Sequence, residues 1–316
     1  MKTICIYHGN CADGFGAAFV VWKAQRIAHW PADVSRNAPT LSPIGRDLVS
    51  NEVEFYPGVY QEAPPDVTGK QILLVDFSYK RDVMLDMASL AHSIYVLDHH
   101  ESAMHDLQGL EGPCPIYITF DMARSGAMIA WDFFFPDEEA PMLIEHIQDR
   151  DLFRFEYPDT RNIQANVFSY PYDFATWDRL MMEVQDSPED FAQEGAAIER
   201  KHWKDLDELL PIVTRTMTIA GHRVPVANLP YTMASDAGHR LAKGQPFAAC
   251  YWDTPTHRVF SLRSTDEGLN VQKIAVAYGG GGHAKAAGFR LTHEQAYKLE
   301  NAQGQARRSR RAGPPC

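Results

Sequence analysis

The sequence predicts an α/β protein in which an N-terminal domain with a parallel sheet is joined by a helical linker to a smaller, mixed α/β domain. Strand-like and helix-like segments alternate through the first half of the 316 residues, a pattern typical of a parallel sheet covered by helices. From Thr216 onward short strands dominate instead. A long polar-apolar helix at about residues 189–210 lies between the two patterns. The predicted parts are therefore residues 1–165, a connector at 166–212, a second domain at 213–295 and a basic, disordered tail at 296–316.

Each predicted element rests on a short apolar run or on helical periodicity. In the first domain we expect strands at residues 4–7, 72–75, 94–97 and 116–120, and helices at 14–27, 80–91 and 142–147, with another opened by Ser125. In the second domain we expect strands at residues 217–220, 224–227, 247–252 and 259–262, and helices at 234–241 and 271–277.

Composition narrows the class of protein. The chain is 45% hydrophobic and 22% charged, as in a soluble globular protein, and no apolar run reaches the roughly 18 residues of a membrane span. The first residues lead straight into a strand, so no signal peptide is predicted. Five widely spaced cysteines fit neither a zinc knuckle nor a disulfide framework. We expect free thiols, a cytoplasmic location and no membrane partner.

Charge is unevenly spread along the chain. The formal net charge is −11, but residues 301–316 hold four arginines and no acid, so the remainder carries −15. Such a body repels long polyanions, whereas a short anionic substrate at a local cationic or metal site stays compatible with it. The basic tail could be a nucleic-acid arm or a solubilising end.

Acids and histidines follow several predicted strands. His8 and Asp13 follow the first, Asp76 ends the second, and His99 ends the third within Asp98-His99-His100. Loops at the carboxyl ends of parallel strands converge on one crevice. Carboxylates gathered there repel one another unless cations lie between them. Oxygen and imidazole ligands suit Mn²⁺, Fe²⁺ or Mg²⁺, and the lack of clustered thiols argues against structural zinc.

Asp149 joins this candidate set because it follows a predicted helix in a polar turn. Taken singly, each residue has a plainer explanation: Asp76 could cap a helix, and His8 could be a hydrogen-bonded strand end. Asp149 and Asp151 could pair with Arg150 and Arg154. The metal hypothesis therefore depends on their occurring together.

The order of these residues resembles the DHH phosphoesterase superfamily, and a glycine-histidine segment near the far end resembles its associated DHHA1 domain. The first likeness is carried by His8, Asp13-Gly14, Val75-Asp76, Asp98-His99-His100 and Asp149. The second is carried by Arg263-Ser264 and by the segment from Gly279 to Phe289. Together they cover about residues 1–295.

The resemblance implies a two-metal phosphoesterase, usually manganese-dependent, with Mg²⁺ or Fe²⁺ as other candidates. Asp76 would bridge the metals, His8 would complete one site, and Asp13, His99 and Asp149 would complete the other. Asp98 would orient the neighbouring imidazole and His100 would face the substrate phosphate. Two cations roughly 3.5–4 Å apart can activate water and neutralise a phosphoryl group.

The DHHA1-like segment implies a phosphate clamp. Consecutive glycines let backbone amides approach a phosphate, and Arg and His add charged donors. The alternative is a flexible hinge or a helix C-cap. The implied substrate-binding residues are Arg263, Ser264, Gly280, Gly281, Gly282, His283 and Lys285.

One position departs from the family pattern. The first loop usually carries two acids spaced Asp-x-Asp, but here Cys11 stands where the first acid belongs. Cys11 or Asn10 could ligate the metal in its place, one metal could bind weakly, or either residue could be an inert part of the loop.

The predicted function is hydrolysis of short oligonucleotides to mononucleotides by a cytoplasmic enzyme that could form a homodimer. The rivals within the same chemistry are a single-strand exonuclease and an enzyme acting on a cyclic dinucleotide or on 3′-phosphoadenosine 5′-phosphate. A nucleotide-binding regulator without catalysis is the alternative of another class.

Overall fold

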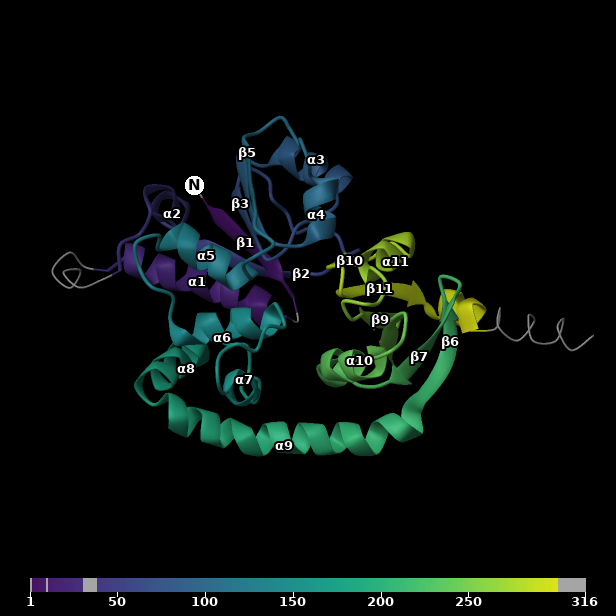
Figure 1. Ribbon diagram of the computed structural model, residues 1–316. Helices are drawn as coiled ribbons and strands as arrows, with labels where there is room; N and C mark the ends of the chain where they lie inside the picture. The colour runs from purple at the N-terminus through teal and green to yellow at the C-terminus, as the bar shows by residue number, and fades with distance from the viewer. Residues whose placement is uncertain (1, 10, 31–38, 301–316) are drawn as a thin grey trace, which may run out of the picture. The chain divides into compact units, whose positions relative to one another are not determined.

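A computed structural model describes residues 2–9, 11–30 and 39–300 (Figure 1). The chain divides into two compact units, Met1–Arg200 and Lys201–Cys316. The division falls inside helix α9 (Pro188–Val213), which corresponds to the predicted connector helix. The predicted fold class is confirmed: the first unit has a parallel sheet and the second a mixed one.

The first unit is built on a five-stranded sheet in the order β2-β1-β3-β4-β5, with every neighbouring pair parallel. Its strands are β1 (Thr3–His8), β2 (Val53–Gly58), β3 (Gln71–Val75), β4 (Ser93–Asp98) and β5 (Ile116–Phe120). Only β2 has no counterpart among the predicted strands. It contains Pro57, and β2 lies at the edge of the sheet, where a strand tolerates proline.

Helices cover both faces of this sheet, which explains the nearly continuous apolar strands. Cys5, Leu73 and Leu97 pack on one face in a core with α1, α5, α6 and α8. Ile4, Ile72 and their neighbours pack on the other face with α3. The helices of this unit are α1 (Ala12–Ala28), α2 (Pro43–Leu48), α3 (Arg81–Leu90), α4 (Glu101–Asp106), α5 (Gly126–Phe134), α6 (Met142–Asp151), α7 (Thr160–Val167) and α8 (Phe174–Asp186).

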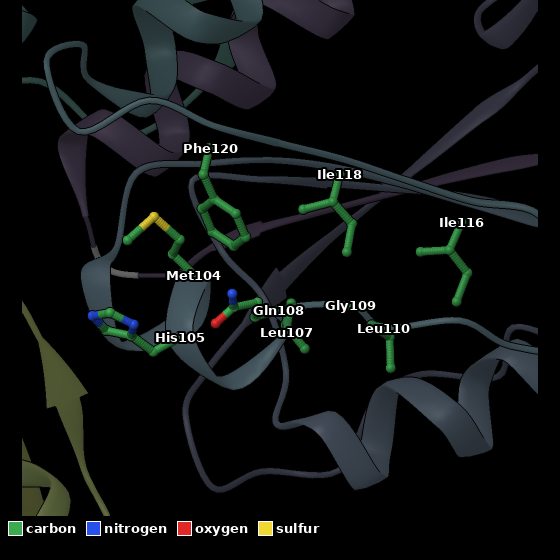
Figure 2. A pocket seen from close by; sticks show the side chains of 9 residues that line it. All are labelled: Met104, His105, Leu107, Gln108, Gly109, Leu110, Ile116, Ile118 and Phe120. Atoms are coloured by element: carbon green, nitrogen blue, oxygen red, sulfur yellow. The ribbon is translucent and has the colours of Figure 1, made fainter.

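A pocket of about 500 Å³ lies beside edge strand β5 (Figure 2). Ile116, Ile118 and Phe120 line one side of it, and residues of α4 and of the following turn line the rest. Its lining is mainly apolar and includes none of the candidate metal ligands. This pocket is therefore separate from the candidate metal ligands.

The second unit contains a six-stranded sheet in the order β10-β11-β9-β8-β7-β6, in which only β7 and β8 pair in parallel. Its strands are β6 (Thr214–Ile219), β7 (His222–Asn228), β8 (Ala248–Asp253), β9 (His257–Arg263), β10 (Gly281–Gly282) and β11 (Ala286–Thr292). The short helix η2 (Tyr231–Met233) precedes α10 (Ala234–Ala242), and α11 (Val271–Ala277) precedes the glycine segment.

Two boundaries differ from the prediction. Helix α6 continues to Asp151, so Asp149 lies in its last turn and not in a polar turn after it. Residues 293–300 are helical, so the ordered part of the second unit extends beyond the predicted boundary at 296. Residues 301–316 of the basic tail lie outside the described residues. Within the described ranges, no helix has both the length and the apolar character needed to span a bilayer.

Candidate metal centre

The three central strands of the first unit's sheet, β1, β3 and β4, have their carboxyl ends side by side. The connection after β1 leads to β2 on one side, and the connection after β3 leads to β4 on the other, so the strand order reverses between β1 and β3. Ligands of open α/β sheets bind outside such a switch point. His8 ends β1, Asp76 follows β3 and Asp98 ends β4, which brings these three predicted residues to one place.

Asp76 is almost completely enclosed. It is 1% exposed, and neither of its carboxylate oxygens accepts a hydrogen bond. Imidazole nitrogens nevertheless lie close: His99 Nε2 is 3.0 Å from Oδ1 and His8 Nδ1 is 3.4 Å from Oδ2. Helix α5 approaches so closely that a Cβ on Gly126 would lie 2.3 Å from the Cβ of Asp76. Because neither oxygen accepts a backbone amide, Asp76 does not cap a helix, and the plainer explanation of this residue is wrong.

Two groups of donors share this neighbourhood. One consists of His8, Cys11 and Asp76, and the other of Asp13, His99 and Asp151. Within each group the nitrogen, sulfur or oxygen atoms lie within 4.8 Å of one another. His99 Nε2 connects the groups, since it lies 3.0 Å from Asp76 and 3.5 Å from Asp13.

Asp13 is fixed by the start of helix α5. It is 2% exposed, and its carboxylate accepts the amides of Gly126 at 2.6 Å and Ala127 at 2.9 Å. These amides belong to the first turn of the helix, which has no acceptors of its own for them. The helix therefore positions the carboxylate beside His99.

Asp151, and not Asp149, lies in the cluster. An oxygen of Asp151 is 3.6 Å from His99 Nε2, and its side chain is 25% exposed. Asp149 is buried and accepts hydrogen bonds from the Glu156 amide at 2.8 Å, the Tyr157 amide at 3.2 Å and the Thr160 hydroxyl at 2.5 Å. Its carboxylate thus holds the turn after α6, and Asp151, two residues further on, lies in the place where Asp149 was predicted.

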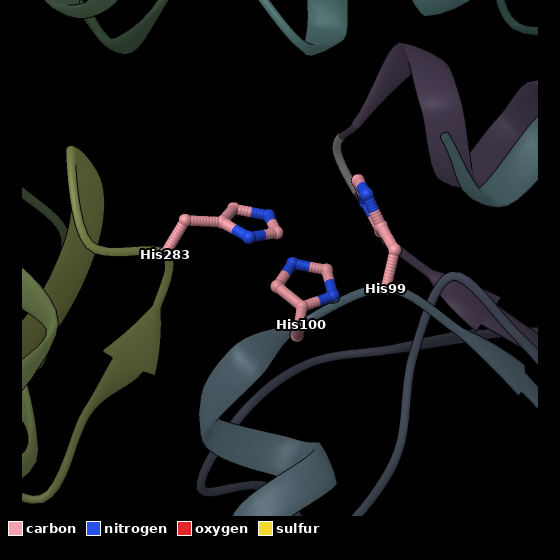
Figure 3. A group of neighbouring side chains, drawn as sticks. All are labelled: His99, His100 and His283. Carbon is pink, nitrogen blue, oxygen red and sulfur yellow. The ribbon is translucent and has the colours of Figure 1, made fainter. Parts of the chain in front are cut away.

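Asp98 fixes the imidazole of His100. Asp98 Oδ1 lies 2.7 Å from His100 Nδ1 and accepts the amides of His99 and His100, while Oδ2 accepts the Ser78 hydroxyl at 2.9 Å. The other ring nitrogen of His100, Nε2, therefore lies on the side of the ring away from Asp98. Figure 3 shows the rings of His99 and His100 at the end of β4; their planes meet at 71°.

The pKa values show how strongly these groups act on one another. Burial raises the pKa of Asp13 and Asp151, and repulsion from Asp76 acts in the same direction. Burial also favours protonation of Asp76, but the imidazoles of His8 and His99 hold its pKa well below the usual range. Burial lowers the pKa of both imidazoles, yet the carboxylates outweigh it and raise the pKa of each well above its ordinary value. The carboxylates of the cluster thus repel one another and favour positive charge placed among them.

A divalent cation fits these residues. The two buried oxygens of Asp76 lack donors, and such groups are costly unless they are paired or bind a metal. The surrounding nitrogen and oxygen donors suit Mn²⁺, Fe²⁺ or Mg²⁺. His8, Cys11 and Asp76 would hold one cation, and Asp13, His99 and Asp151 the other, with Asp76 between them. Asn10, the other candidate in the first loop, lies outside the described residues.

Tyr60 lies beside the cluster although the sequence did not predict it. Its ring centroid lies 5.3 Å from that of His8 and 6.1 Å from that of His100, and its buried hydroxyl has no hydrogen-bond partner. Burial, followed by the charge of Asp98, raises the pKa of Tyr60 well above its usual value, so it is a neutral donor. A single tyrosine outside any motif gives no signal in the sequence.

The predicted clamp residues come together in the second unit. Ala286 of β11 pairs with Arg263 of β9, and the Ser264 amide donates to the Lys285 carbonyl at 2.9 Å. Arg263 Nη1 donates to the Ser261 hydroxyl and the Leu262 carbonyl, both at 2.9 Å. The antiparallel pairing therefore places the Arg-Ser pair beside the end of the glycine segment.

The glycines of this segment are first of all required by the fold. A Cβ on Gly280 would lie 2.0 Å from the Gly288 carbonyl oxygen, and Gly282 has a φ of +131°. Gly279, with a φ of +81°, ends helix α11, and its amide donates to the Val276 carbonyl at 2.9 Å. Gly281 pairs with Gly288 across β10 and β11, so the segment combines a helix C-cap with a short strand and is not a free hinge. The amide of His283 donates to the Ala286 carbonyl at 2.7 Å, which holds the turn that carries its imidazole.

Comparisons with known proteins agree with this architecture. The DHHA1 domain family matches residues 240–306. Uncharacterized protein R106 of Acanthamoeba polyphaga mimivirus is 29% identical over 294 residues, which are 90% of this chain and 66% of that protein. The chain thus spans about two thirds of the length of the curated relative it matches.

Among solved structures, one similar fold is the DHH domain of a member of the s1p family of ribosomal proteins, with a TM-score of 0.56 and 13% identity. The match covers 96% of this chain and 86% of that domain's chain. A pGpG-specific phosphodiesterase from Vibrio cholerae matches with a TM-score of 0.46 and 14% identity. The match covers 96% of this chain and 97% of the chain of that enzyme.

The C-terminal unit contains the segment that matches the DHHA1 domain family, and the two-unit α/β fold resembles that of a solved DHH domain. Both findings agree with the resemblance to DHH and DHHA1 phosphoesterases seen in the sequence.

Proposed function

We propose that this protein is a metal-dependent phosphodiesterase that hydrolyses short oligonucleotides to mononucleotides. The observation that carries the proposal is the buried carboxylate of Asp76, whose oxygens have no hydrogen-bond donor while two imidazoles and two further acids lie around it. Cations bound there, with Mn²⁺ as our first choice, would polarise the phosphoryl oxygens and make a water molecule a better nucleophile.

The chain's own residues divide the remaining tasks. Asp98 holds His100 through Nδ1, so that Nε2 can contact the substrate phosphate. Helix α5 holds the carboxylate of Asp13 beside His99, and Asp149 holds the turn after α6, next to Asp151. In the second unit, Arg263, His283 and Lys285 supply charged donors for the phosphate of a bound substrate. Hydrolysis adds water across one P–O bond and leaves the proton on the departing oxygen.

A short substrate suits the charge of the protein. The chain carries a net charge of −11, which weakens binding of long polyanions at physiological salt, whereas a few phosphates can be held by local donors and cations. We therefore favour di- to pentanucleotides over long single strands. Cytoplasmic location and homodimer formation remain predictions.

The test is turnover of a substrate panel by the full chain in Mn²⁺. Di- to decanucleotides, cyclic dinucleotides and 3′-phosphoadenosine 5′-phosphate are compared by chromatography of the products. We expect the highest kcat/KM for the shortest linear oligonucleotides, and no turnover by Asp76→Asn. Preference for decanucleotides would favour the exonuclease, and preference for the cyclic or monoester compounds would favour those activities. Nucleotide binding without turnover, in protein that has bound its metal, would favour the regulator.

A further inference from the structure

Cys11 occupies the N-cap position of helix α1 without acting as a cap. Its backbone has the extended geometry of an N-cap, with φ −125° and ψ 136°, but its side chain makes no capping hydrogen bond. Its sulfur instead lies within 4.8 Å of a ligand atom of His8 and of Asp76. Among the described cysteines it is the one that belongs to such a group.

The other described cysteines have different surroundings. Cys5 is fully buried in the apolar core beneath α1, as expected of a thiol that only fills space. Cys11 is partly exposed and faces an imidazole and a carboxylate instead. The carboxylate provides a second, independent sign of a ligand, because Asp76 is 1% exposed and neither of its oxygens accepts a hydrogen bond.

We propose that Cys11 is a thiolate ligand that makes the two halves of the centre select different cations. His8, Cys11 and Asp76 offer nitrogen, sulfur and oxygen, a set that prefers a borderline-soft ion of the Zn²⁺, Co²⁺ or Fe²⁺ class. Asp13, His99 and Asp151 offer nitrogen and oxygen only, which suits Mn²⁺ or Mg²⁺. The thiol proton passes to solvent when the sulfur binds the cation.

This inference rests on the proposed function for the presence of cations and adds which cation each half takes. Burial raises the pKa of the Cys11 thiol and His8 acts against it, so the bound cation itself would stabilise the thiolate, at the start of a helix of 17 residues where amide groups point toward negative charge. An aspartate at position 11 would give both halves of the centre the same donor atoms, nitrogen and oxygen.

The direct test is the absorption spectrum of the full chain loaded with Co²⁺. A cobalt–thiolate bond gives a charge-transfer band in the near ultraviolet, which nitrogen and oxygen ligands do not give. We expect this band in the unaltered protein and in Cys114→Ser, a matched control whose thiol lies outside the cluster. We expect it to be absent from Cys11→Ser and Cys11→Asp. Serine and aspartate are favoured N-cap residues, so both variants should keep α1 intact.

The second readout is metal selectivity. Each protein is dialysed against equal Zn²⁺ and Mn²⁺ and its bound metals are measured by mass spectrometry. We expect the ratio of bound Zn²⁺ to bound Mn²⁺ to be at least about tenfold lower in Cys11→Asp than in the unaltered protein. Changes to groups that only support a metal ligand already cost roughly 10–100-fold in affinity.

The outcomes separate the two proposals. Bound Co²⁺ without a thiolate band in the unaltered protein, or a band that persists in Cys11→Ser, would overturn the role of Cys11 and leave the phosphodiesterase proposal standing. Failure to bind any divalent cation would overturn both.

Discussion

In the first unit, the carboxylate of Asp76 is buried and accepts no hydrogen bond, whereas in the second unit the charged groups near the glycine segment are bonded to the backbone beside them. Arg263 donates to the Leu262 carbonyl, and the ammonium of Lys285 donates to the Thr265 carbonyl. In the second region, the folded protein itself thus supplies hydrogen-bond partners for these charged groups. The first region contains two buried carboxylate oxygens without hydrogen-bond donors, which a bound cation would satisfy. Substitutions should therefore act on different quantities in the two regions.

The largest effect is expected from Asp76→Asn. Asp76 has a φ of +54°, which asparagine tolerates better than most residues, so the fold should be kept. Turnover should fall at least about a thousandfold, roughly 4 kcal/mol of transition-state stabilisation, because the shared ligand loses its charge. Steady-state kinetics and thermal unfolding measure the two quantities, with exposed Asp86→Asn as the control. Near-normal turnover in the folded variant would contradict the bridging role of Asp76.

The next comparison sets Asp151→Ala against Asp149→Ala. Removing Asp151 should weaken binding of one cation at least about tenfold with little loss of stability, since the side chain is part exposed. Removing Asp149 should lower the free energy of unfolding by roughly 2–4 kcal/mol, because two amides and a hydroxyl lose their acceptor. Isothermal titration and urea unfolding measure these effects. The reverse pattern would restore Asp149 as the ligand.

In the second unit, His283→Ala should raise KM about tenfold and leave kcat within about twofold, if the imidazole helps to capture the substrate and takes no part in the reaction. Gly280→Ala is the structural counterpart: its Cβ would meet the Gly288 carbonyl oxygen at 2.0 Å, so stability should fall first. Kinetics on both variants, together with their unfolding curves, tests the distinction. An unchanged KM in His283→Ala would remove that residue from the clamp.

The smallest effect is a pH dependence of metal binding. Carboxylates raise the pKa of His8 and His99, and burial raises the pKa of Asp13, so these groups keep their protons to a higher pH than usual. A cation must displace the protons, so affinity for Mn²⁺ should rise between about pH 6 and about pH 8 and should fall on acidification. Calorimetry in buffers of different ionisation enthalpy should detect proton release. Affinity that does not change with pH would show that the cation binds at other groups.

Much of this architecture could be predicted because apolar runs and strand-end acids are local signals. The runs around Ile4, Ile72 and Ile94 became neighbouring strands covered on both faces, and His8, Asp76 and His99 met at their ends. Strand β2 escaped prediction because Pro57 interrupts its pattern, and only its edge position makes that acceptable.

The choice between Asp149 and Asp151 could not be made from the sequence. Residues two apart on a helix point about 200° apart, so one acid faces the cluster and the other the opposite side. Deciding which requires the helix to be placed against β4 and α7. Tyr60 and the contacts of Cys11 likewise depend on how distant segments pack. The residue types that bind cations were visible in the sequence, but their orientations were not.

In the proposed centre, two divalent cations would share the carboxylate of Asp76. Anomalous diffraction from crystals of the full chain grown with Mn²⁺ would locate them. We predict two peaks on either side of Asp76, one toward His8 and Cys11 and one toward Asp13, His99 and Asp151, with both lost in Asp76→Asn. Peaks confined to other parts of the chain, or no peak near Asp76 in protein that has bound manganese, would contradict it.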